Sequence, residues 1–123
     1  MAHILVVDDS ATDQFVFKRV LEENGHQVTV ASDGREGVDL ARRLAPDLVL
    51  MDVVMPGLNG FQATRELHKT DETKEIPVVM VTTKDGRADM KWAQQQGARA
   101  YIVKPAKESQ LLGCISKFVK GNS

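Results

Sequence analysis

Five short, almost continuously apolar runs alternate along this chain with longer segments in which apolar residues recur at helical spacing. The runs span residues 4–7, 28–31, 48–51, 78–81 and 101–103. Such runs are typical of strands that are buried on both faces of a sheet. The intervening segments predict helices near residues 11–24, 35–44, 60–69, 87–96 and 107–120. This alternation predicts an α/β fold in which a parallel sheet carries helices on both faces, with right-handed crossovers.

Glycine and proline residues divide the chain where this pattern requires it. Gly25 and Gly97 follow two of the predicted helices, at the position where a glycine commonly ends a helix. Asp33-Gly34 predicts a turn, and Pro46 predicts the end of the helix before the third strand. Because no repeat or linker interrupts the pattern, we expect one domain over residues 1–123.

The composition limits the classes of protein to which this chain can belong. Hydrophobic residues occupy 42% of the 123 positions, which is enough to build one buried core. No apolar run approaches the roughly 18 residues of a membrane span, so no membrane insertion is expected. A single cysteine, Cys114, is typical of a protein of the reducing cytoplasm. The formal net charge of −1 gives no reason to expect nucleic-acid binding.

Polar side chains follow four of the five predicted strands, at the point where each strand ends. They are Asp8, Asp9, Asp52, Thr82 and Lys104. Taken alone, each has an ordinary interpretation as a helix cap, a loop residue or a solvated side chain. In a parallel sheet, however, the carboxyl ends of the strands share one edge, and ligands bind there. We therefore interpret the five residues together as one site.

The chemistry that suits three carboxylates, a hydroxyl and an ammonium group is metal-assisted phosphoryl transfer. Carboxylates packed together repel one another unless a cation neutralises them, and Mg²⁺ prefers such oxygen ligands. A carboxylate can also act as the nucleophile and form an aspartyl-phosphate. No glycine-rich loop of the kind that cradles nucleotide phosphates follows the first strand, so nucleotide binding is not expected.

The same residues lie within motifs that resemble the receiver domain of bacterial two-component response regulators, a family related to the chemotaxis protein CheY. The motifs are Asp8-Asp9, Asp52 with Met55-Pro56 and Gly60, Val81-Thr82, and Tyr101-Ile102-Val103-Lys104-Pro105. The resemblance covers the whole chain. It implies a flavodoxin-like (βα)5 fold with three layers and a doubly wound parallel sheet of strand order 2-1-3-4-5.

The resemblance also implies a role for each site residue. Asp52 would accept a phosphoryl group from a histidine kinase or phosphotransfer domain. Asp9, Asp52 and the main-chain carbonyl of Val54 would bind Mg²⁺ directly, and Asp8 would act largely through water. Lys104 would pair with the phosphoryl oxygens, and its bond to Pro105 would be cis. Thr82 and Tyr101 would be the switch residues that respond to phosphorylation.

A receiver of this kind implies a signalling protein that catalyses only its own phosphorylation and dephosphorylation. Its output surface would be formed by the predicted helix near 87–96, the strand 101–103 and the helix near 107–120, and would contact a downstream protein. Since 123 residues leave no room for an output domain, we expect a stand-alone receiver, monomeric and cytoplasmic. Residues 1–73 contain 7 basic and 13 acidic side chains, whereas residues 74–123 contain 9 basic and 4 acidic ones. We therefore hypothesise that positive charge assists the contact with the partner.

The stretch 53–65 narrows the resemblance to the single-domain receivers of type IV pilus chemosensory systems, the PilH type, which function in twitching motility and chemotaxis.

Three residues differ from many receivers: Val54, Thr83 and Ala106. The resemblance implies that Val54 and Thr83 lie near the path of a hydrolytic water, so we expect an unusual phosphoryl lifetime. Alternatives are a phosphate sink for a shared kinase, a Mg²⁺-dependent phosphohydrolase, or a phosphorylation-independent scaffold. The sequence Asp8-Asp9-Ser10 lacks the D-x-D motif usual in such phosphohydrolases.

Overall fold

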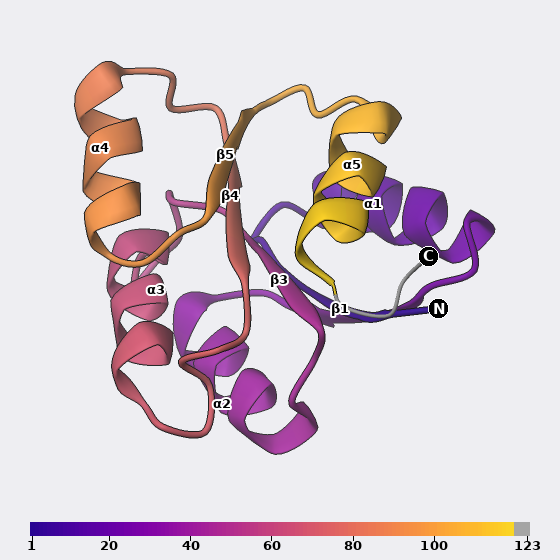
Figure 1. Cartoon of the computed structure of the whole chain (residues 1–123). Coiled ribbons are helices and arrows are strands. Elements are labelled where there is room, and N and C mark those ends of the chain that lie inside the picture. The colour runs from indigo at the N-terminus through magenta and orange to yellow at the C-terminus, as the bar shows by residue number, and fades with distance from the viewer. Residues whose placement is uncertain (120–123) are drawn as a thin grey trace.

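The computed structural model describes residues 1–119, which form one parallel five-stranded sheet with a helix after each strand (Figure 1). The sheet order is β2-β1-β3-β4-β5, as the resemblance implied. The strands are β1 (His3–Val7), β2 (Gln27–Ala31), β3 (Leu48–Met51), β4 (Val78–Thr82) and β5 (Ala100–Val103). The helices are α1 (Ala11–Glu23), α2 (Gly34–Leu44), α3 (Gly60–Lys69), α4 (Arg87–Gln95) and α5 (Glu108–Phe118).

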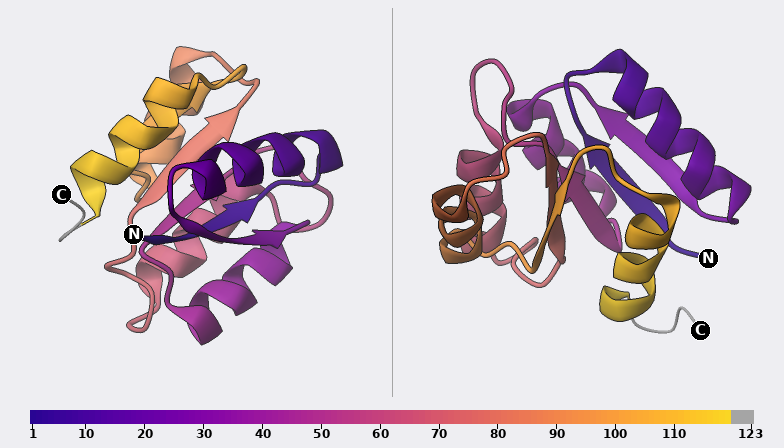
Figure 2. Two further views of the ribbon diagram at one scale, coloured as in Figure 1. Left: turned by 90° about the vertical axis from the view of Figure 1, so that its right-hand side faces the viewer. Right: turned by 90° about the horizontal axis from the view of Figure 1, so that it is seen from above.

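The sheet separates two apolar cores because successive side chains of a strand point to opposite faces. In β1, Ile4 and Val6 pack on the face that α1 and α5 cover, where Phe17 and Leu111 complete the core. Leu5 and Val7 pack on the opposite face, which is covered by α2, α3 and α4. Both views in Figure 2 show these two helical layers. The three-layer, doubly wound arrangement expected from the sequence is therefore confirmed.

All ten elements lie within a few residues of the predicted ranges. One expectation is wrong: β2 and β5 are not fully buried on both faces, since most of their residues are partly exposed. The reason is topological, because these strands form the two edges of the sheet. The predicted last helix extended to Lys120, which lies outside the described residues. Within residues 1–119, no helix is long and apolar enough to cross a membrane.

The ends of the helices explain several of the sequence signals. Ser10 caps α1, since its side chain accepts a hydrogen bond from the Asp13 amide, which leaves Asp8 and Asp9 free for another role. Asp33 caps α2 and Gly34 is already helical, so this pair is a helix start and the predicted turn is wrong. Gly25 and Gly97 have φ of 87° and 109°, which confirms that each supplies the left-handed conformation after a helix.

Candidate phosphoryl-transfer site

The pairing register of the central strands brings two carboxylates together. Val7 of β1 lies opposite Met51 of β3, so the next residues, Asp8 and Asp52, are neighbours at the carboxyl edge. The ladder continues there, because the Asp52 amide donates to the Val7 carbonyl at 2.9 Å. Both side chains are buried, with relative exposures of 1% for Asp8 and 8% for Asp52. The strand order therefore places two acids side by side in a protected position.

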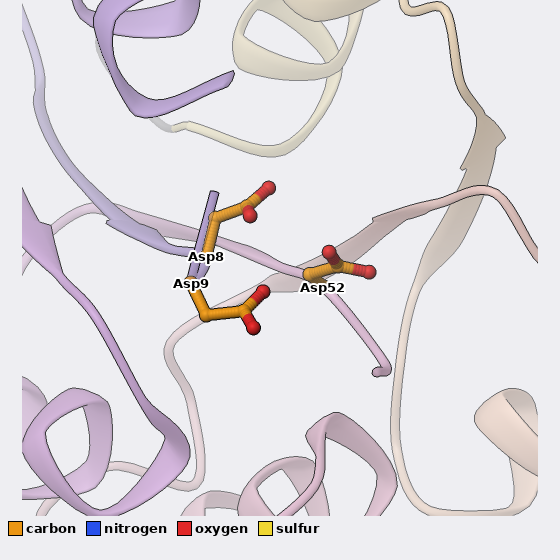
Figure 3. Close-up of side chains that lie close together, drawn as sticks. All are labelled: Asp8, Asp9 and Asp52. Atoms are coloured by element: carbon orange, nitrogen blue, oxygen red, sulfur yellow. The ribbon is translucent and has the colours of Figure 1, made fainter. Parts of the chain in front are cut away.

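Asp9 completes a group of three carboxylates at this edge. The side chains of Asp8, Asp9 and Asp52 point toward a common space, as Figure 3 shows. One oxygen of each lies within 4.8 Å of the others. Asp9 is exposed whereas the other two are buried, so the group opens to solvent at Asp9. This arrangement confirms that the acids following strands one and three converge, as the topology argument predicted.

Lys104 ties the cluster together from the end of β5. Its Nζ donates to Oδ2 of Asp8 at 2.8 Å, of Asp13 at 2.7 Å and of Asp52 at 3.1 Å. The Lys104 side chain is only 10% exposed. Its bond to Pro105 is cis, as expected. A buried ammonium that contacts two buried carboxylates is stable only as a mutually compensated group, because each charge alone would be costly to desolvate.

The protonation of the site follows from burial and from these contacts. Burial raises the pKa of Asp8, and the nearby Asp52 charge adds to that effect, although hydrogen bonds from Lys104 and the Ser10 amide oppose it. Burial alone would lower the pKa of Lys104, but its hydrogen bonds to Asp13, Asp8 and Asp52 outweigh burial and raise it. Lys104 is consequently protonated at neutral pH, and three carboxyl groups contact this one ammonium group.

The remaining residues of the predicted site lie around this centre. Thr82 is fully buried at the end of β4, and its hydroxyl oxygen accepts a long hydrogen bond, 3.4 Å, from the Lys84 amide. Tyr101 donates its hydroxyl to the Lys84 carbonyl at 2.8 Å. Val54 follows Asp52 by two residues, and its side chain is 56% exposed. Lys104 therefore holds the acids, whereas Thr82 and Tyr101 meet at the loop between β4 and α4.

Two residues at the site were missed by the sequence reasoning, and the structural role of a third was not recognised. Asp13 contacts Lys104 from the first turn of α1, and Gln14 donates its side-chain amide to the Asp8 carbonyl. The signal was available, because a helix that starts at the carboxyl edge points its first turn toward that edge. Gly60 was noted only as part of a motif. A Cβ at this position would lie 1.9 Å from the Asp52 carbonyl oxygen, so only glycine allows the start of α3 to pass directly beneath Asp52.

The fold and the acidic cluster define a receiver-type α/β domain, and the comparison with known families agrees. The chain matches the response regulator receiver domain over residues 4–116 and belongs to that family. It is 54% identical to the protein PilH of Pseudomonas aeruginosa over 121 residues, which cover 98% of this chain and all of PilH. This similarity supports the PilH-type resemblance noted in the sequence.

Solved structures show the same relationship. The chemotaxis protein CheY4 of Vibrio cholerae superimposes with a TM-score of 0.90 at 29% identity, over 97% of this chain and 99% of that one. The receiver domain of the sensor histidine kinase PA1611 of Pseudomonas aeruginosa superimposes with a TM-score of 0.88 at 31% identity. That match covers 95% of this chain and 96% of the other, which was solved with a magnesium ion in its active-site cleft.

The donor set of this chain fits such an ion. Receiver domains typically bind Mg²⁺ in an acidic pocket, and here three carboxylates are within 4.8 Å of one another. Hard oxygen donors at this spacing suit Mg²⁺, which keeps several of its waters and needs only one or two carboxylates. The burial that raises the pKa of Asp8 also favours a bound cation, since a cation would relieve the uncompensated negative charge.

Proposed function

We propose that this chain is a response regulator that accepts a phosphoryl group on Asp52 from a histidine kinase or phosphotransfer domain. The observation that carries the proposal is the Lys104 ammonium group, which bridges Asp52 and Asp8 beside Asp9 at the carboxyl edge of the sheet. This geometry supplies a nucleophile, a fixed positive charge and an oxygen-rich cation site at one place. Phosphoryl transfer requires these three components.

Asp52 is the nucleophile in this proposal. One of its oxygens, Oδ1, accepts a hydrogen bond from the Val53 amide at 2.7 Å, and the other, Oδ2, contacts Lys104 at 3.1 Å. A carboxylate oxygen forms the bond to phosphorus as the bond from phosphorus to the donor's imidazole nitrogen breaks, and the imidazole takes up a proton. Lys104 then neutralises the transferred oxygens. A Mg²⁺ ion held by Asp9, Asp52 and the Val54 carbonyl, with Asp8 acting through water, would supply further positive charge.

The proposed output is a change in the surface formed by α4, β5 and α5. Thr82 and Tyr101 connect the site to this surface, because both contact Lys84 in the loop that precedes α4. On α4, Met90 and Trp92 are exposed apolar side chains that a partner protein could cover. The similarity to PilH supports a place in type IV pilus chemosensory signalling, and the basic second half of the chain favours an acidic partner surface.

Intact-mass measurement with acetyl phosphate and Mg²⁺ tests the proposal. We expect a gain equal to one phosphoryl group that is absent in Asp52→Ala and without Mg²⁺. Asp39→Ala, which removes an exposed carboxylate from α2, should behave as the unaltered protein. Turnover of unrelated phosphoesters would instead indicate a phosphohydrolase. The absence of an adduct with any donor would indicate a scaffold.

The lifetime of the adduct tests whether Val54 shapes the site. Its exposed apolar side chain offers no hydrogen bond to a water that attacks the phosphoryl group, and Thr83, which follows β4, is also exposed. We expect Val54→Asn to change the first-order decay rate of the aspartyl-phosphate. An unchanged decay would remove Val54 from the explanation. A short lifetime, together with drainage of phosphate from a kinase shared with a second regulator, would favour the role of a phosphate sink.

A further inference from the structure

Asp13 makes the shortest of the three contacts of Lys104. Its Oδ2 lies 2.7 Å from Nζ, compared with 2.8 Å for Asp8 and 3.1 Å for Asp52. An ammonium group has three N–H donors, and these three carboxylates occupy all of them. For Lys104 to contact a phosphoryl group, one present contact must therefore be released or shared.

The three partners differ in how easily they can release Lys104. The side chains of Asp8 and Asp52 are 2% and 9% exposed, so water cannot readily replace the ammonium group there. The Asp13 side chain is 35% exposed, and solvent can take over its hydrogen bonds. Asp13 also lies outside the group of three carboxylates that could share a metal ion. Asp13 is thus the partner whose contact with Lys104 can break most easily. A cation bound by the other three carboxylates would not neutralise Asp13 directly.

We propose that Asp13 is a positioning residue that holds Lys104 toward α1 in the unphosphorylated protein and competes with the incoming phosphoryl group for it. This inference rests on the proposed function. The competition is electrostatic as well as geometric, because Asp13 adds a negative charge beside a site that an anionic donor must enter. Neutralising Asp13 should release Lys104 and remove that repulsion, so phosphorylation becomes faster.

A purely structural role for Asp13 predicts a different result. Its amide donates to the Ser10 side chain at 3.2 Å, and its carboxylate lies in the first turn of α1, where negative charge favours a helix. Loss of that role would change the unfolding midpoint but would not accelerate a reaction at Asp52. The rate of phosphorylation therefore separates the two roles.

The test compares Asp13→Asn, Asp13→Glu and Glu22→Gln. Glu22→Gln removes the same charge from an exposed position of the same helix. At saturating Mg²⁺, the phosphorylation rate with acetyl phosphate should rise about three- to tenfold in Asp13→Asn. Asp13→Glu should remain near the unaltered rate, and Glu22→Gln should not change it. An unchanged or slower rate in Asp13→Asn, or an equal rise in Glu22→Gln, would overturn the proposal.

A second measurement does not depend on phosphorylation. The hydrogen-exchange rate of the Lys104 ammonium group, followed by NMR in the metal-free protein, reports how firmly it is held. We expect faster exchange in Asp13→Asn but not in Glu22→Gln, and unchanged exchange would refute the holding role. If Asp52 accepts no phosphoryl group while exchange responds as expected, the proposed function fails and the Asp13–Lys104 contact stands.

Discussion

The acidic cleft at the carboxyl edge and the outer face of α4 and β5 hold their charges in opposite ways. In the cleft, Lys104 is nearly buried and lies 2.7–3.1 Å from its three carboxylate partners. On the α4 side, the Lys84–Asp89 pair is 3.9 Å apart, and both side chains are substantially exposed. The apolar side chains there, Met90 and Trp92, are also open to solvent. The side chains of the cleft are therefore held in place by the mutual compensation of buried charges. The side chains of the outer face make few contacts within the protein.

This difference indicates which region should respond to an added charge and which region can change its conformation at low cost. A buried charge cluster responds strongly to one added charge, because few water molecules screen it. A surface with few internal contacts can repack at low cost. Tyr101 links the two regions, since its hydroxyl binds the Lys84 carbonyl beside α4 while the Asp52 charge in the cleft contributes to raising its pKa.

The largest expected effect is that of Lys104→Met. Methionine keeps most of the side-chain volume but leaves Asp8 and Asp52 without their cation, so the free energy of unfolding should fall by about 3 kcal/mol. Lys84→Met removes a partly exposed ammonium group beside α4 and should cost less than about 0.5 kcal/mol. Urea unfolding in metal-free buffer measures both. Equal losses would show that burial does not distinguish the two lysines.

A smaller loss is expected for Gly60→Ala. The added Cβ would lie 1.9 Å from the Asp52 carbonyl oxygen, so β3 and α3 must separate, at a cost of about 2 kcal/mol. Gly113→Ala in α5 meets no atom within 4 Å and should stabilise the chain by about 0.5–1 kcal/mol. Thermal unfolding of the two variants checks the opposite signs. Phosphorylation of Gly60→Ala should also be impaired, because Asp52 is displaced.

Asp8→Asn should stabilise the folded protein, by less than Gly60→Ala destabilises it. Burial raises the pKa of Asp8, so the folded protein binds this proton more tightly than the unfolded chain. The contribution of Asp8 to stability is therefore greatest at acidic pH and is lost as the pH rises from 3.8 through the folded pKa. In metal-free buffer at neutral pH, Asp8→Asn should be more stable than the unaltered protein.

Two controls accompany this prediction. Mg²⁺ should stabilise the unaltered protein and reduce its difference from Asp8→Asn, because a cation offsets the same charge. Asp89→Asn on the outer face should be slightly destabilising, since Asp89 lies in the first turn of α4. Urea unfolding across the pH range distinguishes these outcomes. A less stable Asp8→Asn at neutral pH would mean that the Lys104 contact outweighs the desolvation of Asp8.

The sequence predicted the elements of this fold because each boundary has a local chemical signal. Apolar β-branched runs and helical periodicity are determined by neighbouring residues, and the glycines after α1 and α4 satisfy a local backbone requirement. The convergence of Asp8, Asp52 and Lys104 also followed, once a parallel sheet was inferred. The strand order came from the family resemblance, since hydrophobic pattern alone does not choose among parallel topologies.

The parts that the sequence did not predict depend on contacts between distant segments. Asp13 and Lys104 are 91 positions apart, and nothing near Asp13 indicates which cation it meets. The partial exposure of β2 and β5 likewise follows from their place at the sheet edges and not from their composition. Glycine is required at position 60 because the Asp52 backbone carbonyl lies so close to it, and no local sequence pattern reveals that approach. Residue types therefore indicated the chemistry of the site, but tertiary packing determined how its charges are compensated.

The smallest expected effect concerns Tyr101, which joins the two regions. Tyr101→Phe removes one hydrogen bond, to the Lys84 carbonyl, and should lower the free energy of unfolding by about 1 kcal/mol or less. Burial, with the charges of Asp89, Asp52 and Asp85, raises the pKa of Tyr101 from 10.0 to about 12. Its contribution to stability is thus present below pH 10 and is lost as the pH rises toward 12.

Tyr101 is the sole tyrosine of the chain, so tyrosinate absorbance reports its titration directly. We expect a midpoint near 12 in the folded protein and near 10 in urea. Asp89→Asn should lower the folded midpoint, and Asp52→Asn should lower it by a smaller amount, because the Asp89 charge has the larger influence on Tyr101. If the folded midpoint is the same in Asp52→Asn as in the unaltered protein, the cleft and the outer face are not coupled electrostatically through Tyr101. Signalling between them would then depend on the packing of Thr82 and Tyr101 alone.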